Sequence, residues 1–199
     1  INLKQGFSLI ELLIVVAIFG LTVSLVTAAF VTFERNQKLR NGAQQLKSDL
    51  RQAQNNALSG NKGSGSAVCP GTSTLGGWYL QISTDSTNGE NGKYTLSGDC
   101  RTGTDDSSFA TRTIFLPNGV SISSTSLGAV SDIGILFRPL ISGVTYHNAA
   151  LVPPFFDADG NLLNEVGAGS ALTITLTSAT GGTYQVAISP SGEINEVKP

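Results

Sequence analysis

The sequence is poor in the residues from which enzymes build active sites. Only 13% of its 199 residues are charged, His147 is the single histidine, and the two cysteines do not form a Cys-x-x-Cys pair. A catalytic triad or a zinc site would need partners for that histidine, and the sequence does not offer them. It also lacks a Gly-x-Ser-x-Gly elbow and a P-loop. We therefore predict a protein that is not an enzyme, with no catalytic residue and with His147 in a loop or at a strand end.

Basic residues are scarce in the second part of the chain. Residues 63–199 hold five Lys or Arg against eleven Asp or Glu, whereas residues 1–62 hold seven bases against three acids. Phosphate binding requires clustered Lys and Arg, so an acidic surface is a poor nucleic-acid platform. We expect no nucleic-acid partner.

Charge is missing altogether from residues 12–33, a run of twenty-two residues. At about 1.5 Å per residue, a helix of this length reaches roughly 33 Å, enough to cross the hydrocarbon core of a bilayer, about 30 Å thick. Glu11 lies directly before this run. A carboxylate inside a membrane is costly and marks a functional site by default, although an acid near the membrane face also reaches water. The sequence thus predicts a membrane span with one unusual acid.

The helical pattern continues beyond the apolar run, and no proline interrupts it. Small and aliphatic residues recur at steps of three and four, which is typical of a narrow apolar stripe on one face of a helix. These residues are Leu39, Ala43, Leu46, Leu50, Ala53 and Ala57. We predict one helix from about Leu9 to Leu58, with Gly60 just past its end and Gly42 as a weak point.

From residue 64 onward the pattern is that of strands separated by Gly and Asn turns. We expect strands at residues 77–83, 93–97, 111–116, 120–123, 133–137, 171–177, 183–188 and 193–195. Their order along the chain indicates an antiparallel meander. The predicted fold class is α+β: a long N-terminal helix whose amphipathic half packs on an antiparallel β-rich globular head.

Cys69 and Cys100 form an even pair in a part of the chain that the membrane reading places outside the cytoplasm. That compartment can be oxidising, which favours a disulfide over two free buried thiols. A bridge would close a long loop and stabilise the head by roughly 2–4 kcal/mol.

Asp157, Asp159 and Asn161 present oxygens at alternating positions, which makes them candidate calcium ligands. The spacing departs from the EF-hand pattern, and Asp-Gly between apolar pairs is also a good hairpin turn. We predict the turn and no cofactor, with calcium as the alternative.

The apolar run Pro153-Pro154-Phe155-Phe156 also has two interpretations. It either contacts a neighbouring subunit or tucks its aromatic rings into the core of its own head.

Lys4-Gln5-Gly6 followed by Phe7-Ser8-Leu9-Ile10-Glu11 resembles the processing and N-methylation signature of type IV pilins and type II secretion pseudopilins. The resemblance implies that a prepilin peptidase cuts after Gly6 and methylates the new N-terminal residue, Phe7. It also implies that Glu11 of one subunit meets the Phe7 ammonium of another, because a buried ion pair is tolerable where a lone buried charge is not.

The helix of residues 46–57, then Gly77-Trp78-Tyr79, Phe137-Arg138-Pro139 and a terminal hairpin at residues 191–194 are similar to the H-type minor pseudopilins and related minor type IV pilins. The resemblance implies a structural subunit of a pilus or pseudopilus filament, with a tip adhesin or DNA-uptake pilin as the alternative. It implies four parts: a cleaved leader at 1–6, a transmembrane and filament-core half-helix at 7–33, an amphipathic half-helix at 34–60 and a head at 61–199.

The same resemblance implies the partners and the location. The partners are other pilin subunits, the prepilin peptidase and an inner-membrane assembly platform. The precursor is expected to sit in the bacterial inner membrane with its head outside the cytoplasm, and then to enter the filament.

Overall fold

The structure is a computed structural model that describes residues 8–65, 67–103, 105–128, 130–140, 143–179 and 181–197, with the side chains of residues 25–29 and 67 left out. Two compact units make up the chain: residues 1–37, whose described part we call the stem, and residues 38–199, which we call the head. Each unit is described by itself.

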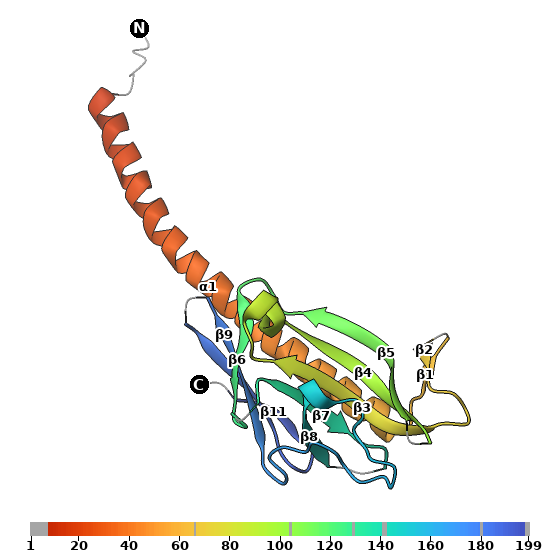
Figure 1. The fold of residues 1–199 in the computed structure, drawn as a ribbon. Coiled ribbons are helices and arrows are strands. Elements are labelled where there is room, and N and C mark those ends of the chain that lie inside the picture. The colour runs from red at the N-terminus through yellow and green to blue at the C-terminus, as the bar shows by residue number, and fades with distance from the viewer. Residues whose placement is uncertain are drawn as a thin grey trace. The chain divides into compact units, whose positions relative to one another are not determined.

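One long helix, α1 (Leu9–Leu58), opens the described chain, as the sequence predicts (Figure 1). It ends where expected. Gly60 adopts a left-handed φ of 64°, and its amide donates to the carbonyl of Ala57 over 3.1 Å. A residue with a Cβ is disfavoured in this conformation, so the glycine terminates the helix.

The predicted stripe on the second half of α1 forms the spine of the head. Its six residues are at most 3% exposed and share one hydrophobic core with side chains from both sheets of the head. Polar contacts fix the helix at its flanks. Lys47 pairs with Glu196 at 2.9 Å, and the Tyr94 hydroxyl donates to Asp49 at 2.6 Å. The prediction of an amphipathic half-helix packed on strands is confirmed.

Gly42, the expected weak point, lies buried in this helix. A Cβ at that position would lie 3.3 Å from Pro117 and from Val120. The absence of a side chain therefore lets the turn before strand β6 (Val120–Thr125) approach the helix closely, which offsets the lower helix propensity of glycine.

The described strands form a five-stranded sheet, a four-stranded sheet and a small ribbon, all antiparallel. The first sheet has the order β5-β4-β3-β7-β8 and the second the order β11-β10-β9-β6. The first contains β3 (Thr74–Ser83), β4 (Lys93–Thr102), β5 (Asp105–Phe115), β7 (Asp132–Phe137) and β8 (Val144–Asn148). The second contains β6 (Val120–Thr125), β9 (Leu172–Ser178), β10 (Thr183–Ile188) and β11 (Ile194–Val197). The ribbon pairs β1 (Gly63–Ser64) with β2 (Ala67–Val68), and two short 3₁₀ helices, η1 (Thr87–Gly92) and η2 (Ala149–Leu151), complete the elements.

Two expectations about the strands are wrong. The head is not one meander, because β6 leaves the first sheet to pair with β9 and β7 returns to pair with β3. Strand β8 was also not predicted, and it carries His147 one residue before its last residue, Asn148, so the histidine lies near a strand end and not in a loop. Alternation of apolar and polar residues indicates a strand but does not determine which strand it pairs with. Strand β8 is stabilised by its pairing with β7.

The five-stranded sheet is covered on both faces. Leu80 of β3 faces the core that contains α1, whereas its neighbour Tyr79 belongs to a second, smaller core with Phe155 and Phe156. Successive residues of a strand point to opposite faces, so the segment after η2 covers the face away from the helix. Of the two interpretations of the Pro-Pro-Phe-Phe run, the structure shows the aromatic rings tucked into the head itself.

Candidate functional site: the apolar stem and the start of its helix

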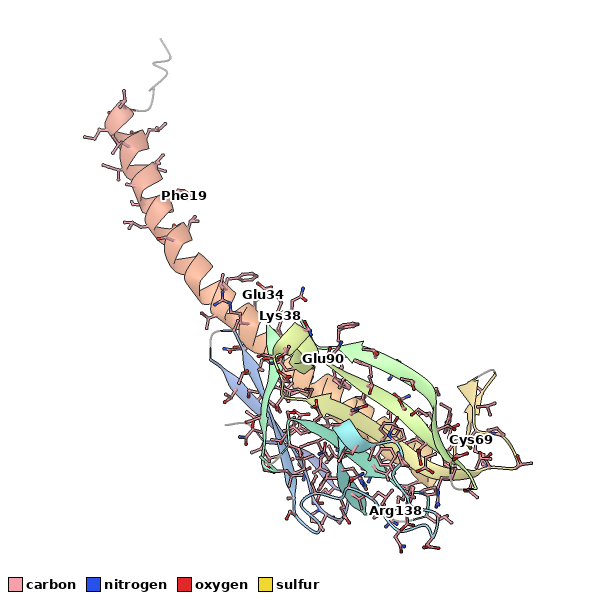
Figure 2. All side chains as sticks on the ribbon, in the orientation of Figure 1. Phe19, Glu34, Lys38, Cys69, Glu90 and Arg138 are labelled. Carbon is pink, nitrogen blue, oxygen red and sulfur yellow. A yellow bond between two sulfur atoms is a disulfide. The ribbon has the colours of Figure 1, made fainter. Side chains whose placement is uncertain are left out.

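The stem displays large apolar side chains around its whole circumference. Apart from the partly buried Val31, those that the structure describes are between 47% and 82% exposed, and Figure 2 labels Phe19 among them. They are Leu9, Ile10, Leu12, Leu13, Ile14, Val15, Val16, Ile18, Phe19, Leu21, Val23, Phe30 and Phe33. A soluble monomer rarely exposes a contiguous apolar patch of more than a few hundred Å². A helix that is apolar all round needs a covering partner, whether lipid or protein.

In the part of the chain that the structure describes, no helix combines the length and the mean hydropathy of a span.

Glu11 lies in the first turn of α1. The backbone amides of Glu11 and Leu12 donate to the carbonyl of Ser8 at 3.1 and 3.2 Å, which makes Ser8 the residue that precedes the helix. Ser8 and Glu11 thus occupy the first and last positions of the Ser-x-x-Glu capping pattern, a local role that the sequence analysis missed. The positive end of the helix dipole also stabilises an acid at this position, by about 0.3–1 kcal/mol.

Gly6 and Phe7 lie outside the described residues. The cut between them, the methylation of Phe7 and its pairing with Glu11 therefore stay predictions.

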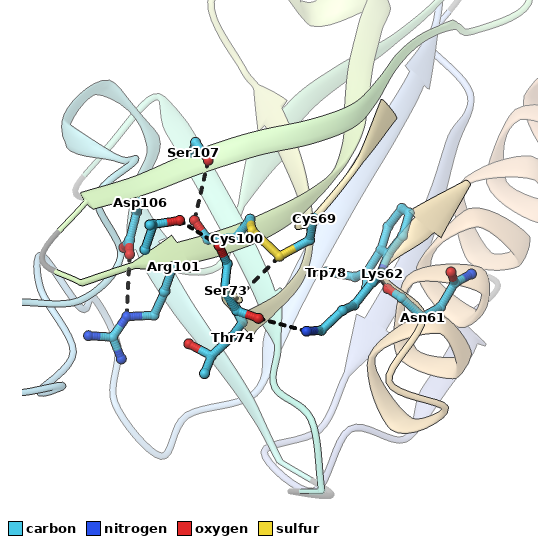
Figure 3. Close-up of a disulfide and its surroundings, with 11 residues drawn as sticks. Asn61, Lys62, Cys69, Ser73, Thr74, Trp78, Cys100, Arg101, Asp106 and Ser107 are labelled. Carbon is cyan, nitrogen blue, oxygen red and sulfur yellow. Dashed lines mark hydrogen bonds and ion pairs between the residues drawn. A yellow bond between two sulfur atoms is a disulfide. The ribbon is translucent and has the colours of Figure 1, made fainter. Parts of the chain in front are cut away.

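In the head, Cys69 and Cys100 form the expected disulfide, with the two sulfur atoms 1.99 Å apart and the Cα atoms 5.5 Å apart (Figure 3). The bridge ties the loop after α1 to strand β4. The same loop is held by Lys62, which donates to the carbonyl of Ser73 at 2.6 Å, and by the indole of Trp78, which donates to the carbonyl of Asn61 at 2.7 Å. The prediction of a disulfide is confirmed, and its position indicates a structural role, in which it holds the loop after α1 against strand β4.

His147 is fully buried and both of its ring nitrogens have partners. Nδ1 lies 2.7 Å from the carbonyl of Leu163, and Nε2 lies 2.9 Å from the hydroxyl of Thr145. A carbonyl only accepts, so Nδ1 donates and the neutral ring accepts at Nε2. Burial lowers the pKa of His147, against a smaller raising effect of the Leu163 hydrogen bond. The ring is a packing element whose burial favours the neutral form.

The candidate calcium ligands build a turn. Asp157 Oδ1 accepts from the amides of Asp159 and Asn161 at 2.9 and 2.8 Å, and the chain reverses between Phe156 and Leu162. The side-chain amide of Asn161, which donates to Asp157 Oδ2 at 3.0 Å, lowers the pKa of Asp157 most, and the main-chain amides add to this effect. Among the described residues, no group of three or more His, Cys, Asp and Glu side chains could hold a metal ion. The predicted turn is confirmed, and calcium binding stays untested.

One charged cluster of the head escaped the sequence analysis. Asp99 and Arg101 on β4 and Asp106 on β5 lie under the Phe155-Phe156 segment, and Asp99 is fully buried. An acid and a base two residues apart are common on exposed strands, so this spacing does not indicate a buried charged cluster. The cluster is unusual only because the Phe155-Phe156 segment buries it.

Two protein families match the chain. Residues 1–27 match the prokaryotic N-terminal methylation motif, and residues 42–135 match the type II transport protein GspH. No curated protein and no solved structure matches the chain. The first match falls on the start of the apolar helix, and the second runs from the buried half of α1 into β7. The chain thus carries a methylation motif at its N-terminus and a GspH domain match that begins within α1 and runs into its α+β head, which is consistent with a minor pseudopilin or pilin.

Proposed function

We propose that this protein is a minor structural subunit of a type IV pilus-like or type II secretion pseudopilus filament. It is made as a precursor in the bacterial inner membrane, cut after Gly6 by a prepilin peptidase and methylated at Phe7. It then assembles with other pilin subunits on an inner-membrane platform. The observation that carries the proposal is the stem, whose apolar side chains are exposed on every side.

The exposed stem supports assembly through its helix. Residues 12–33 of the stem carry no charged side chain that water could solvate. Before assembly, lipid covers such a helix, and afterwards the stems of neighbouring subunits do. In the described part of the head, the apolar stripe on α1 is already buried and is therefore not available for assembly.

Glu11 separates a filament subunit from a simple membrane tether. In the filament its carboxylate pairs with the Phe7 ammonium of a neighbour, and removal of one partner leaves an unpaired charge among apolar helices. We expect Glu11→Ala to insert in the membrane normally and to enter filaments severalfold less than wild type. Co-expression with the assembly machinery, followed by shearing and quantification of the protein in the filament and membrane fractions, measures this.

The local capping role of Glu11 calls for a second variant. Glu11→Gln keeps a residue that suits the third position of the capping pattern but removes the charge. If the ion pair drives assembly, Glu11→Gln fails like Glu11→Ala. If Glu11→Gln assembles like wild type while Glu11→Ala fails, Glu11 only caps the helix. Wild-type assembly of both variants would remove any role of Glu11.

A further inference from the structure

Residues 152–165, which we call the strap, cover the face of the five-stranded sheet opposite to α1. The strap has no regular strand or helix of its own among its described residues. Its best-anchored point is Asp106 on β5, whose Oδ2 accepts from the amides of Phe155 and Phe156 at 2.9 and 3.1 Å. Arg101 adds a second anchor. It donates to the carbonyl of Asp157 at 3.2 Å, and its guanidinium lies 4.6 Å from the centre of the Phe156 ring.

Beneath the strap lies Asp99, a carboxyl group with no exposed surface. Neither of its oxygens has a hydrogen-bond partner among the described residues. A side chain at Gly76 would overlap this carboxyl, and its Cβ would lie 3.3 Å from Phe156. Gly76 therefore makes room for Asp99, and the Phe156 ring packs over the same spot. A buried carboxylate without partners is costly, whereas the protonated acid is much cheaper to bury.

The charges around Asp99 come from strands and strap together. Burial, followed by the nearby charge of Asp106, raises the pKa of Asp99 to about 7, although Arg101 acts in the opposite direction. Tyr79 on β3 is close enough for Asp99 to raise its pKa, but burial has the larger effect. At its anchored end the strap offers main-chain amides and a carbonyl. Of its three acids, Asp157 and Asp159 lie on the exposed turn, and Glu165 lies opposite His147 at the far end of the strap.

We propose that the strap is a pH-dependent cover, closed over Asp99 while its carboxyl is protonated and released locally when that carboxyl ionises. Ionisation places a second negative charge beside Asp106, the group that accepts both strap amides. Lifting the strap lets water reach Asp99 without unfolding the sheet, because the sheet keeps its other core against α1.

The direction of the effect follows from linkage. In the open state Asp99 has its ordinary pKa near 4, and in the closed state its pKa is about 7. Closure is therefore favoured below about pH 4, weakens as the pH rises to about 7, and changes no further above it. His147, which packs on Phe155 and bonds to the carbonyl of Leu163 near the other end of the strap, acts oppositely. Its pKa is lowered in the closed state, so its contribution to closure is lost as the pH falls below about 6.5.

A comparison of two variants isolates Asp99 from His147. Asp99→Asn keeps the shape of the protonated acid, and His147 is unchanged in it. The test measures amide hydrogen exchange of Phe155 and Phe156 in the full-length protein in detergent micelles, as protection factors at pH 5 and pH 8. We expect the ratio of the Asp99→Asn protection factor to the wild-type factor to rise about 100-fold over this interval. Asp159→Asn, which removes an exposed acid of the strap, is the matched control and should leave the ratio to wild type constant.

Three results would overturn the proposal. A ratio for Asp99→Asn that does not change with pH removes Asp99 as the trigger. An equal loss of protection at core amides of β3 and β7 shows global unfolding and not a local cover. If Asp99→Asn does not fold, carboxyl-carbon NMR of the wild type decides: Asp99 must titrate near pH 7 together with the strap amides, and an ordinary acidic midpoint contradicts the proposal.

Discussion

Leu50→Ala should lower the free energy of unfolding of the head by about 2–5 kcal/mol. Leu50 is fully buried in the stripe of α1, within the core that includes residues from both sheets. The substitution leaves a cavity, and the slightly better helix propensity of alanine does not offset it. Urea unfolding in detergent micelles, followed by the fluorescence of Trp78, measures the loss.

Leu58→Ala is the matched control for this prediction. It is the same substitution in the last turn of the same helix, at a side chain that is 47% exposed. We expect a loss below about 1 kcal/mol, since surface changes rarely cost more. Equal losses for both variants would show that the stripe is not the spine of the head.

Cys69→Ser with Cys100→Ser should cost a comparable amount, about 4 kcal/mol. The bridge closes a loop of 31 residues, and in the chain-entropy model its removal returns that conformational freedom to the unfolded state. Chemical reduction of the wild type should produce the same loss. Unfolding midpoints of wild type, reduced wild type and the double variant, taken side by side, measure the effect.

The serine substitutions and the reduction test the disulfide in different ways. Both sulfur atoms belong to almost fully buried residues, and Ser also places hydroxyls there. A double variant that loses much more stability than the reduced wild type has lost packing as well as the bridge. No loss on reduction would contradict the structural role of the bridge.

The helix could be predicted from the sequence nearly to the residue. Steps of three and four between Leu39 and Ala57 define one face, and Gly60 marks the end, since both signals are local. The disulfide was also predictable, because two cysteines allow only one intramolecular pairing. Strict alternation in residues 172–177 gave β9 for the same reason.

The arrangement of strands could not be predicted in this way. Whether β6 pairs with β4 or with β9 depends on contacts between residues about fifty positions apart, which no local pattern encodes. Strand β8 and the cluster of Asp99, Arg101 and Asp106 were missed for a related reason. Strand β8 depends on its pairing with β7, and the burial of the cluster depends on the segment that covers it. Neither contact can be recognised from the local sequence.

The central claim is that the stem becomes a filament core after processing of its N-terminus. Mass spectrometry of the N-terminal peptide of the mature protein, purified from cells that contain a prepilin peptidase, tests it most directly. We predict a peptide that begins at Phe7 and carries one extra methyl group on its α-amine, and we predict that Gly6→Val abolishes both changes. A mature protein that keeps Gly6, or begins at Phe7 in cells without the peptidase, would contradict the account.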